Sequence, residues 1–72
     1  MTEVLMIIEN RAKKMITTNR PFVGNSILDN GYYYTVKRII LRSGSSIMEA
    51  IVDPPGNLDD YDLFHLYGWK AL

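Results

Sequence analysis

The chain has 72 residues, no cysteine and a formal net charge of zero. These values predict one domain and exclude a disulfide framework or a cysteine-based zinc site. The 47% hydrophobic content is ordinary for a globular protein and argues against disorder. Zero net charge gives no overall attraction to nucleic acid, although bases are in excess over residues 1–42 and acids over residues 43–72. Because a core this small is only marginally stable alone, a homodimer or an obligate partner is favoured.

The first eight residues are apolar but do not resemble a secretory signal. Met1–Ile8 is short, lacks a basic start and is followed by charged residues. No apolar run in the sequence is long enough to cross a bilayer. We therefore expect a cytoplasmic protein that does not associate with membranes.

Residues 2–17 are predicted to form a helix. Thr2 can cap its start, and Asn19 and Pro21 end it. The apolar residues at helical spacing are Val4, Leu5, Ile8, Ala12, Met15 and Ile16. The alternative interpretation makes Val4–Ile8 a strand.

The connector Pro21–Asn30 leads to a turn at Asp29-Asn30-Gly31. Asparagine and glycine tolerate the left-handed backbone that a tight hairpin turn requires. A hairpin of Ile27–Leu28 with Tyr32–Thr35 is therefore predicted.

The central prediction is a second hairpin over Tyr32–Asp53, with its turn in Ser43–Ser46. A two-residue loop at Gly44 and Ser45 sets the register. On the predicted core face the pairs are Leu41 with Met48, Ile39 with Ala50, and Lys37 with Val52. On the other face they are Arg42 with Ile47, Ile40 with Glu49, Arg38 with Ile51, and Val36 with Asp53. Because that second face mixes isoleucines with charges, we expect part of it to be covered.

The C-terminal part begins with the rigid turn Asp53-Pro54-Pro55-Gly56-Asn57. A short helix or 3₁₀ turn is predicted within Leu58–Tyr67, with acids at its start, where the helix dipole favours them. Trp69–Leu72 is predicted to be a final edge strand.

These elements predict an α+β protein: a small SH3-like antiparallel β-barrel or curled sheet with an N-terminal helix. Residues 1–72 form a single domain, with the helix at 2–17 and a β-rich part at 22–72. The chain from Gly24 to Leu72 resembles small SH3-like proteins of the kind that bacteriophages encode. The resemblance rests on Asp29-Asn30-Gly31, Tyr32–Leu41, Met48–Asp53 and Leu63–Trp69. It implies an accessory or host-directed factor.

Catalytic patterns are missing from the sequence. The five glycines are scattered at turns, so there is no phosphate-binding loop. His65 is the one histidine, and no local signature connects it with a serine nucleophile. Asp59, Asp60 and Asp62 could bind a hard cation, but their spacing does not match a calcium loop and fits a helix start better. We therefore expect no enzymatic activity, no cofactor and no metal.

Aromatic and basic residues supply two candidate binding groups. The first is Tyr32, Tyr33 and Tyr34 with Lys37, Arg38 and Arg42, where rings could stack bases and cations could hold phosphates. The second is Trp69 with Tyr61, Phe64 and Tyr67, which could form a protein-binding surface. The competing interpretation places these aromatic residues in the core and pairs the arginines with Glu49 or Asp53.

From this elimination we expect a small non-enzymatic protein-binding factor. A phage-encoded modulator or inhibitor of a host protein is the form that the resemblance implies. The predicted contact residues are Tyr32, Tyr34, Arg38, Arg42 and Trp69. The alternative is a single-stranded nucleic-acid-binding protein that uses the tyrosine and arginine face of the same sheet.

Overall fold

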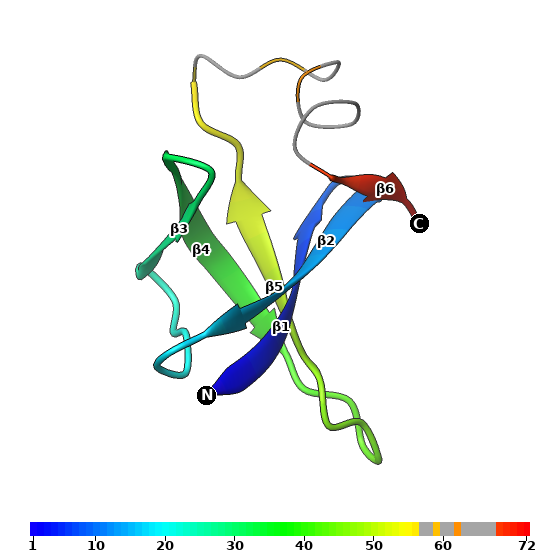
Figure 1. Cartoon of the computed structure of the whole chain (residues 1–72). Coiled ribbons are helices and arrows are strands. Elements are labelled where there is room, and N and C mark those ends of the chain that lie inside the picture. The colour runs from blue at the N-terminus through cyan, green and yellow to red at the C-terminus, as the bar shows by residue number, and fades with distance from the viewer. Residues whose placement is uncertain (57–58, 60–61, 63–67) are drawn as a thin grey trace.

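The computed structural model describes residues 1–56, 59, 62 and 68–72, and within them the chain forms one mixed sheet (Figure 1). Its strands are β1 (Thr2–Ile8), β2 (Arg11–Thr17), β3 (Ser26–Asp29), β4 (Tyr32–Ile40), β5 (Met48–Asp53) and β6 (Lys70–Ala71). Their order across the sheet is β3-β4-β5-β1-β2-β6. Neighbouring strands are antiparallel except β1 and β5, which are parallel.

The predicted helix over residues 2–17 is wrong, and so is the α+β class that depended on it. This segment is the β1–β2 hairpin, paired from Thr2 with Thr17 to Ile8 with Arg11. The described residues contain no helix, so the protein belongs to the β class. The turn at Glu9 and Asn10 requires φ +53° at Glu9.

The position of β1 explains why the sequence pattern misled the prediction. β1 lies between β5 and β2, so both of its edges are paired and its side chains have cross-strand neighbours on both faces. Val4, Met6 and Ile8 are buried on one face, while Leu5 and Ile7 are half-buried on the other. A short, continuous apolar run of this kind fits a strand and a helix equally well.

The sheet curls into a half-barrel (Figure 1), and the core lies on its concave face. The buried core consists of Val4, Met6, Ile8, Ile27, Tyr34, Val36, Ala50, Val52 and Trp69. The curled β-rich sheet of the prediction is therefore present, with the N-terminal segment adding two strands to it. The parallel pairing of β1 with β5 was not predicted.

The predicted hairpin over Tyr32–Asp53 is confirmed, but residues 41–47 connect its strands in place of a two-residue loop, and the predicted pairs of Leu41 with Met48 and of Arg42 with Ile47 are not formed. The pairs of Ile39 with Ala50, Ile40 with Glu49, and Arg38 with Ile51 are as predicted. A β-bulge at Lys37 then shifts the pairing, so that Val36 lies opposite Val52 and Thr35 opposite Asp53. The predicted pairs of Lys37 with Val52 and of Val36 with Asp53 are therefore wrong. The bulge turns Val36 into the core and leaves Lys37 exposed.

The hairpin of β3 with β4 is also confirmed. Ile27 lies opposite Tyr34, and the turn has positive φ at both Asn30 (+51°) and Gly31 (+80°). The predicted edge strand over Trp69–Leu72 is present as β6, which pairs with β2. The helix predicted within Leu58–Tyr67 lies outside the described residues.

Candidate protein-interaction site

Two of the predicted contact residues, Tyr34 and Trp69, lie in the core. Their side chains are 0% and 1% exposed, and their ring centroids are 5.5 Å apart with the planes tilted by 44°. Tyr34 comes from β4, whereas Trp69 directly precedes β6. This aromatic pair joins two elements that are far apart in the sheet order, so it stabilises the curled shape and presents no surface to a partner.

The polar atoms of this pair are buried as well. The Tyr34 hydroxyl and the Trp69 indole nitrogen approach each other, but neither makes a hydrogen bond of normal geometry with a described residue. Burial raises the pKa of Tyr34, and the neighbouring Trp69 indole partly offsets that rise. Negative charge on Asp29 adds to the rise in the Tyr34 pKa. Tyr34 therefore remains a neutral phenol in the core.

The other three predicted contact residues are divided between environments. Tyr32 is half-buried and packs against the core, whereas Arg38 and Arg42 are exposed. Arg42 follows β4 in the β4–β5 loop, where its guanidinium holds the carboxylate of Glu49 through Nε and, at 3.3 Å, through Nη2. That contact raises the pKa of Arg42. The five predicted residues therefore do not form one surface.

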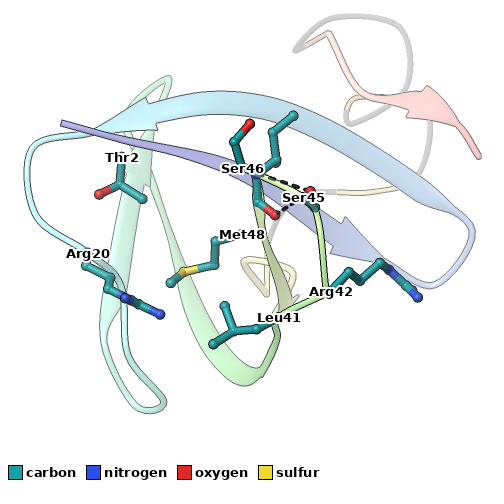
Figure 2. Close-up of a pocket in the computed structure, with 8 residues that line it drawn as sticks. Thr2, Arg20, Leu41, Arg42, Ser45, Ser46 and Met48 are labelled. Carbon is teal, nitrogen blue, oxygen red and sulfur yellow. Dashed lines mark hydrogen bonds between the residues drawn. The ribbon is translucent and has the colours of Figure 1, made fainter.

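A small cleft lies beside Arg42, at the end of the sheet where the β4–β5 loop approaches the N-terminal strand (Figure 2). This loop cleft has a volume of about 260 Å³. Its lining residues are Thr2, Arg20, Leu41, Arg42, Ser45, Ser46, Ile47 and Met48. Figure 2 shows Leu41 and Met48 between Arg20 on one side and Arg42 on the other.

Local backbone contacts shape the loop that forms the cleft. Gly44 has φ +80°, and the Ser45 N–H donates to the Arg42 carbonyl at 3.2 Å, which folds the loop back on itself. The Ser45 hydroxyl also lies 3.2 Å from the backbone N–H of Ile47 and accepts its hydrogen bond. The loop is therefore fixed by its own hydrogen bonds before any partner arrives.

The cleft combines an exposed apolar side chain with two arginines, one of which is paired with an acid of the described chain. Leu41 is 63% exposed, although its predicted place was on the core face. Arg42 is already neutralised by Glu49, while Arg20 makes no ion pair with a described residue. The volume is below the range of about 300–1,000 Å³ typical of ligand and cofactor pockets. It suits one or two side chains of a protein partner.

Charges on the outer face of the sheet are compensated within the chain. Lys37 lies 3.5 Å from Asp53, and Lys14 lies 4.0 Å from Glu3. Arg42 with Glu49 makes a third pair across neighbouring strands. Two of these three pairs join a base of residues 1–42 to an acid of residues 43–72, so each of these bases is compensated within the chain.

Sequence reasoning found Arg42 but missed Arg20 and Leu41. Arg20 lies in the connector after β2, where no local pattern marks a contact residue. Leu41 continues the alternation of β4, and its exposure follows from the end of that strand at Ile40. Proline and glycine residues mark turns in the sequence, but they do not predict that Arg20 or Leu41 lines a cleft.

The described part of the chain was found to contain neither a metal-binding group nor a membrane-spanning helix. No group of three or more His, Asp or Glu side chains there could hold a metal ion. The backbone N–H of Asp62 donates to a carboxylate oxygen of Asp59 at 2.8 Å, so this acid is engaged locally. His65 and Asp60 lie outside the described residues. No described helix is long and apolar enough to cross a membrane.

Comparisons with known proteins give no relative for this chain. No protein-family model, no curated protein and no solved structure matches it. The resemblance to phage-encoded SH3-like proteins therefore stays a prediction. The fold defines a small protein with a curled β-sheet, and its function must be argued from the cleft.

Proposed function

We propose that the protein is a non-enzymatic factor that binds another protein through the loop cleft. The observation that carries this proposal is the exposure of Leu41 between two arginines, on a loop fixed by its own hydrogen bonds. Arginine is enriched at protein interfaces and binding hot spots, and the exposed Leu41 adds an apolar group between the two arginines. A loop that is already ordered loses little conformational freedom on binding, which favours affinity.

The charges of the cleft indicate the chemistry of the partner. Arg42 is held by Glu49, so its charge is largely satisfied within the chain. Arg20 has no such acid among the described residues, so its guanidinium can donate hydrogen bonds to a carboxylate of the partner. We therefore infer a partner surface that places an apolar side chain on Leu41 and an acidic side chain beside Arg20.

The finer form of the proposal is a cytoplasmic modulator that acts by covering part of its target. A protein without a catalytic cluster can still inhibit another protein by occupying its contact surface. The resemblance to phage-encoded SH3-like proteins supports a host protein as that target.

Single-stranded nucleic acid is the second candidate partner, and the geometry favours it less. Base stacking needs exposed rings, but Tyr34 is buried and Tyr32 is half-buried. Tyr33 is exposed, while Lys37, four residues further along β4, is engaged by Asp53. Phosphate binding by such a face would compete with ion pairs inside the chain.

Affinity capture from lysate of the cells in which the chain is made tests the proposal. We expect a stoichiometric protein band that survives nuclease treatment and is lost with Arg20→Glu. The matched control is Lys70→Glu, which reverses an exposed charge on β6, away from the cleft. A band that disappears with nuclease would favour nucleic acid. Equal capture by the wild type and Arg20→Glu would refute the loop cleft as the binding site.

A further inference from the structure

The free edge of the sheet at β3 carries an inference that goes beyond the loop cleft. β3 pairs with β4 on one side and is the last strand of the sheet on the other. A groove of about 320 Å³ separates β3 from the end of β2, and no strand of the described residues pairs with this edge. The other long unpaired edge, on β2 beyond β6, carries Lys14, whereas Ser26–Leu28 contains no charged residue and no proline. Lysine and proline are the residues that usually prevent edge pairing.

The hydrogen-bond pattern shows which backbone groups of β3 face outward. The Val36 N–H donates to the Asn25 carbonyl at 2.8 Å, which makes this a hydrogen-bonded pair. Hydrogen-bonded and non-hydrogen-bonded pairs alternate along an antiparallel ladder. The backbone N–H and C=O groups of Ser26 and Leu28 are therefore directed away from β4, toward the free edge.

Exposed apolar side chains gather around this same edge. Leu28 lies opposite Tyr33 in the β3–β4 pairing, Ile16 and Leu28 line the same groove, and Phe22 and Val23 belong to the connector beside it. All five side chains are between 54% and 65% exposed. Phe22 and Tyr33 are aromatic, and each aromatic side chain can bury ~150–250 Å² at an interface. With the aliphatic side chains and the backbone of the paired strands, they contribute a large part of the about 800 Å² that each partner of a standard interface buries.

We propose that a second copy of this chain pairs with the β3 edge, so that two half-barrel sheets join through antiparallel β3 strands. A two-fold axis at Ile27 places Ser26 of one copy opposite Leu28 of the other. The outward N–H and C=O groups of these two residues then bond each other, which makes the edge self-complementary. Ser26 is small, so it leaves room for Leu28 of the second copy.

Charge supports a second copy as the occupant. The paired segment Ser26–Leu28 is uncharged, so no like charges meet across the axis. Asp29, the nearest acid, is held by Lys13 of its own chain at 2.6 Å and lies opposite Asn25 of the second copy in this register. A partner of strong charge would find no complement along this edge.

Sedimentation equilibrium over a concentration series tests the proposal. We expect the wild type to change from 8.3 kDa to twice that mass as concentration rises. Leu28→Lys should weaken this dimer at least tenfold, because it places one lysine on each side of the axis, roughly 9 Å apart. Leu72→Lys is the matched control, since Leu72 is also exposed but follows β6, away from the β3 edge and from the loop cleft. A wild type that stays at 8.3 kDa throughout would overturn the proposal and leave the edge to a strand of another protein.

Cysteine cross-linking tests the register, because the natural chain has no cysteine. Hydrogen-bonded residues on paired strands have Cα atoms about 5.5 Å apart, within disulfide range. Mixing Ser26→Cys with Leu28→Cys under oxidation should therefore give a covalent dimer. Ser26→Cys alone should not, since those two positions are roughly 9 Å apart across the axis. Equal cross-linking of Ser26→Cys with itself would contradict this register.

Discussion

The two edges of the sheet are built in different ways. At the β6 edge, two residues of strand follow the buried Trp69, and the Leu72 N–H donates to the Asn10 carbonyl at 2.8 Å. At the β3 edge, a strand of four residues directs the backbone groups of Ser26 and Leu28 outward, with exposed apolar side chains beside them. β6 is therefore a very short edge held to β2 beside a core residue, whereas β3 is a longer edge beside exposed apolar side chains.

The two edges therefore have different roles: the region around β6 contributes to stability, and the outer side of β3 contributes to association. Trp69 contributes a large buried surface, so the chain around β6 belongs to the core. β3 contributes one core residue, Ile27, and is joined to β2 by the ion pair of Lys13 with Asp29. Substitutions near β6 should change unfolding, and substitutions on the outer side of β3 should change binding.

Trp69→Ala should have the largest effect on stability. It removes the largest fully buried side chain and the ring contact with Tyr34, at a cost of about 3–5 kcal/mol in the free energy of unfolding. Urea unfolding measures this loss. Leu72→Ala is the control, because an exposed side chain should change the same quantity by less than about 0.5 kcal/mol. A loss below about 1 kcal/mol for Trp69→Ala would show that the β6 edge is not part of the core.

The ion pair between Lys13 and Asp29 should give the next largest effect. Its atoms are 2.6 Å apart, and the two side chains are 19% and 16% exposed, so water screens the pair only in part. Lys13→Met or Asp29→Asn should each cost about 1–2 kcal/mol of unfolding free energy. The double variant should cost less than the sum, because both changes remove the same contact. Additive effects in this double-mutant cycle would mean that the pair does not hold β3 to β2.

Gly31→Ala should destabilise the β3 hairpin by about 1 kcal/mol. Gly31 has φ +80°, a conformation that alanine adopts only with strain, while the space around the position is open. The cost therefore comes from the backbone and not from a clash. Gly56→Ala is the matched control, since that glycine also has open space but no positive φ. Equal unfolding curves for the two variants would contradict this origin of the cost.

Tyr34 should affect stability mainly at high pH. Its pKa is raised by burial, so the folded state keeps the phenol proton above pH ~10, where an unfolded tyrosine loses it. Stability should therefore fall as pH rises above ~10, and Tyr34→Phe should reduce this fall. Near pH 7 the same substitution should have little effect, because the hydroxyl makes no hydrogen bond of normal geometry with a described residue. A pH profile unchanged by Tyr34→Phe would refute the assignment.

Turn chemistry made two of the three hairpins predictable. Asn30-Gly31 and the serine-glycine run around Gly44 predict reversals of the chain. The alternation of side chains along a strand then predicts Ala50 and Val52 as core residues. The β1–β2 turn carries no glycine, and Glu9 adopts the left-handed region without a sequence signal. No sequence signal therefore opposed a helix over residues 2–17. The pairing of β1 with β5 and β2 makes this segment a hairpin.

The rest of the structure depends on contacts that sequence patterns do not encode. The bulge at Lys37 exchanges the faces of part of β4, and a shift of one residue is invisible in a strand with apolar residues on both faces. Tyr34 and Trp69 were candidates for contact and for the core, and only their meeting in space decides between these roles. For the candidate site, Arg42 was predictable from composition, whereas Arg20 reaches the loop cleft only through the path of the connector.

The central claim is that the loop cleft serves binding and not folding, and a paired measurement on Leu41→Asp tests it most directly. Thermal unfolding and capture of the partner would be compared for the wild type, Leu41→Asp and the control Leu72→Asp, both leucines being exposed. We expect both variants to unfold within about 0.5 kcal/mol of the wild type. We further expect Leu41→Asp alone to lose the captured protein. Retained capture by a folded Leu41→Asp variant would contradict the claim.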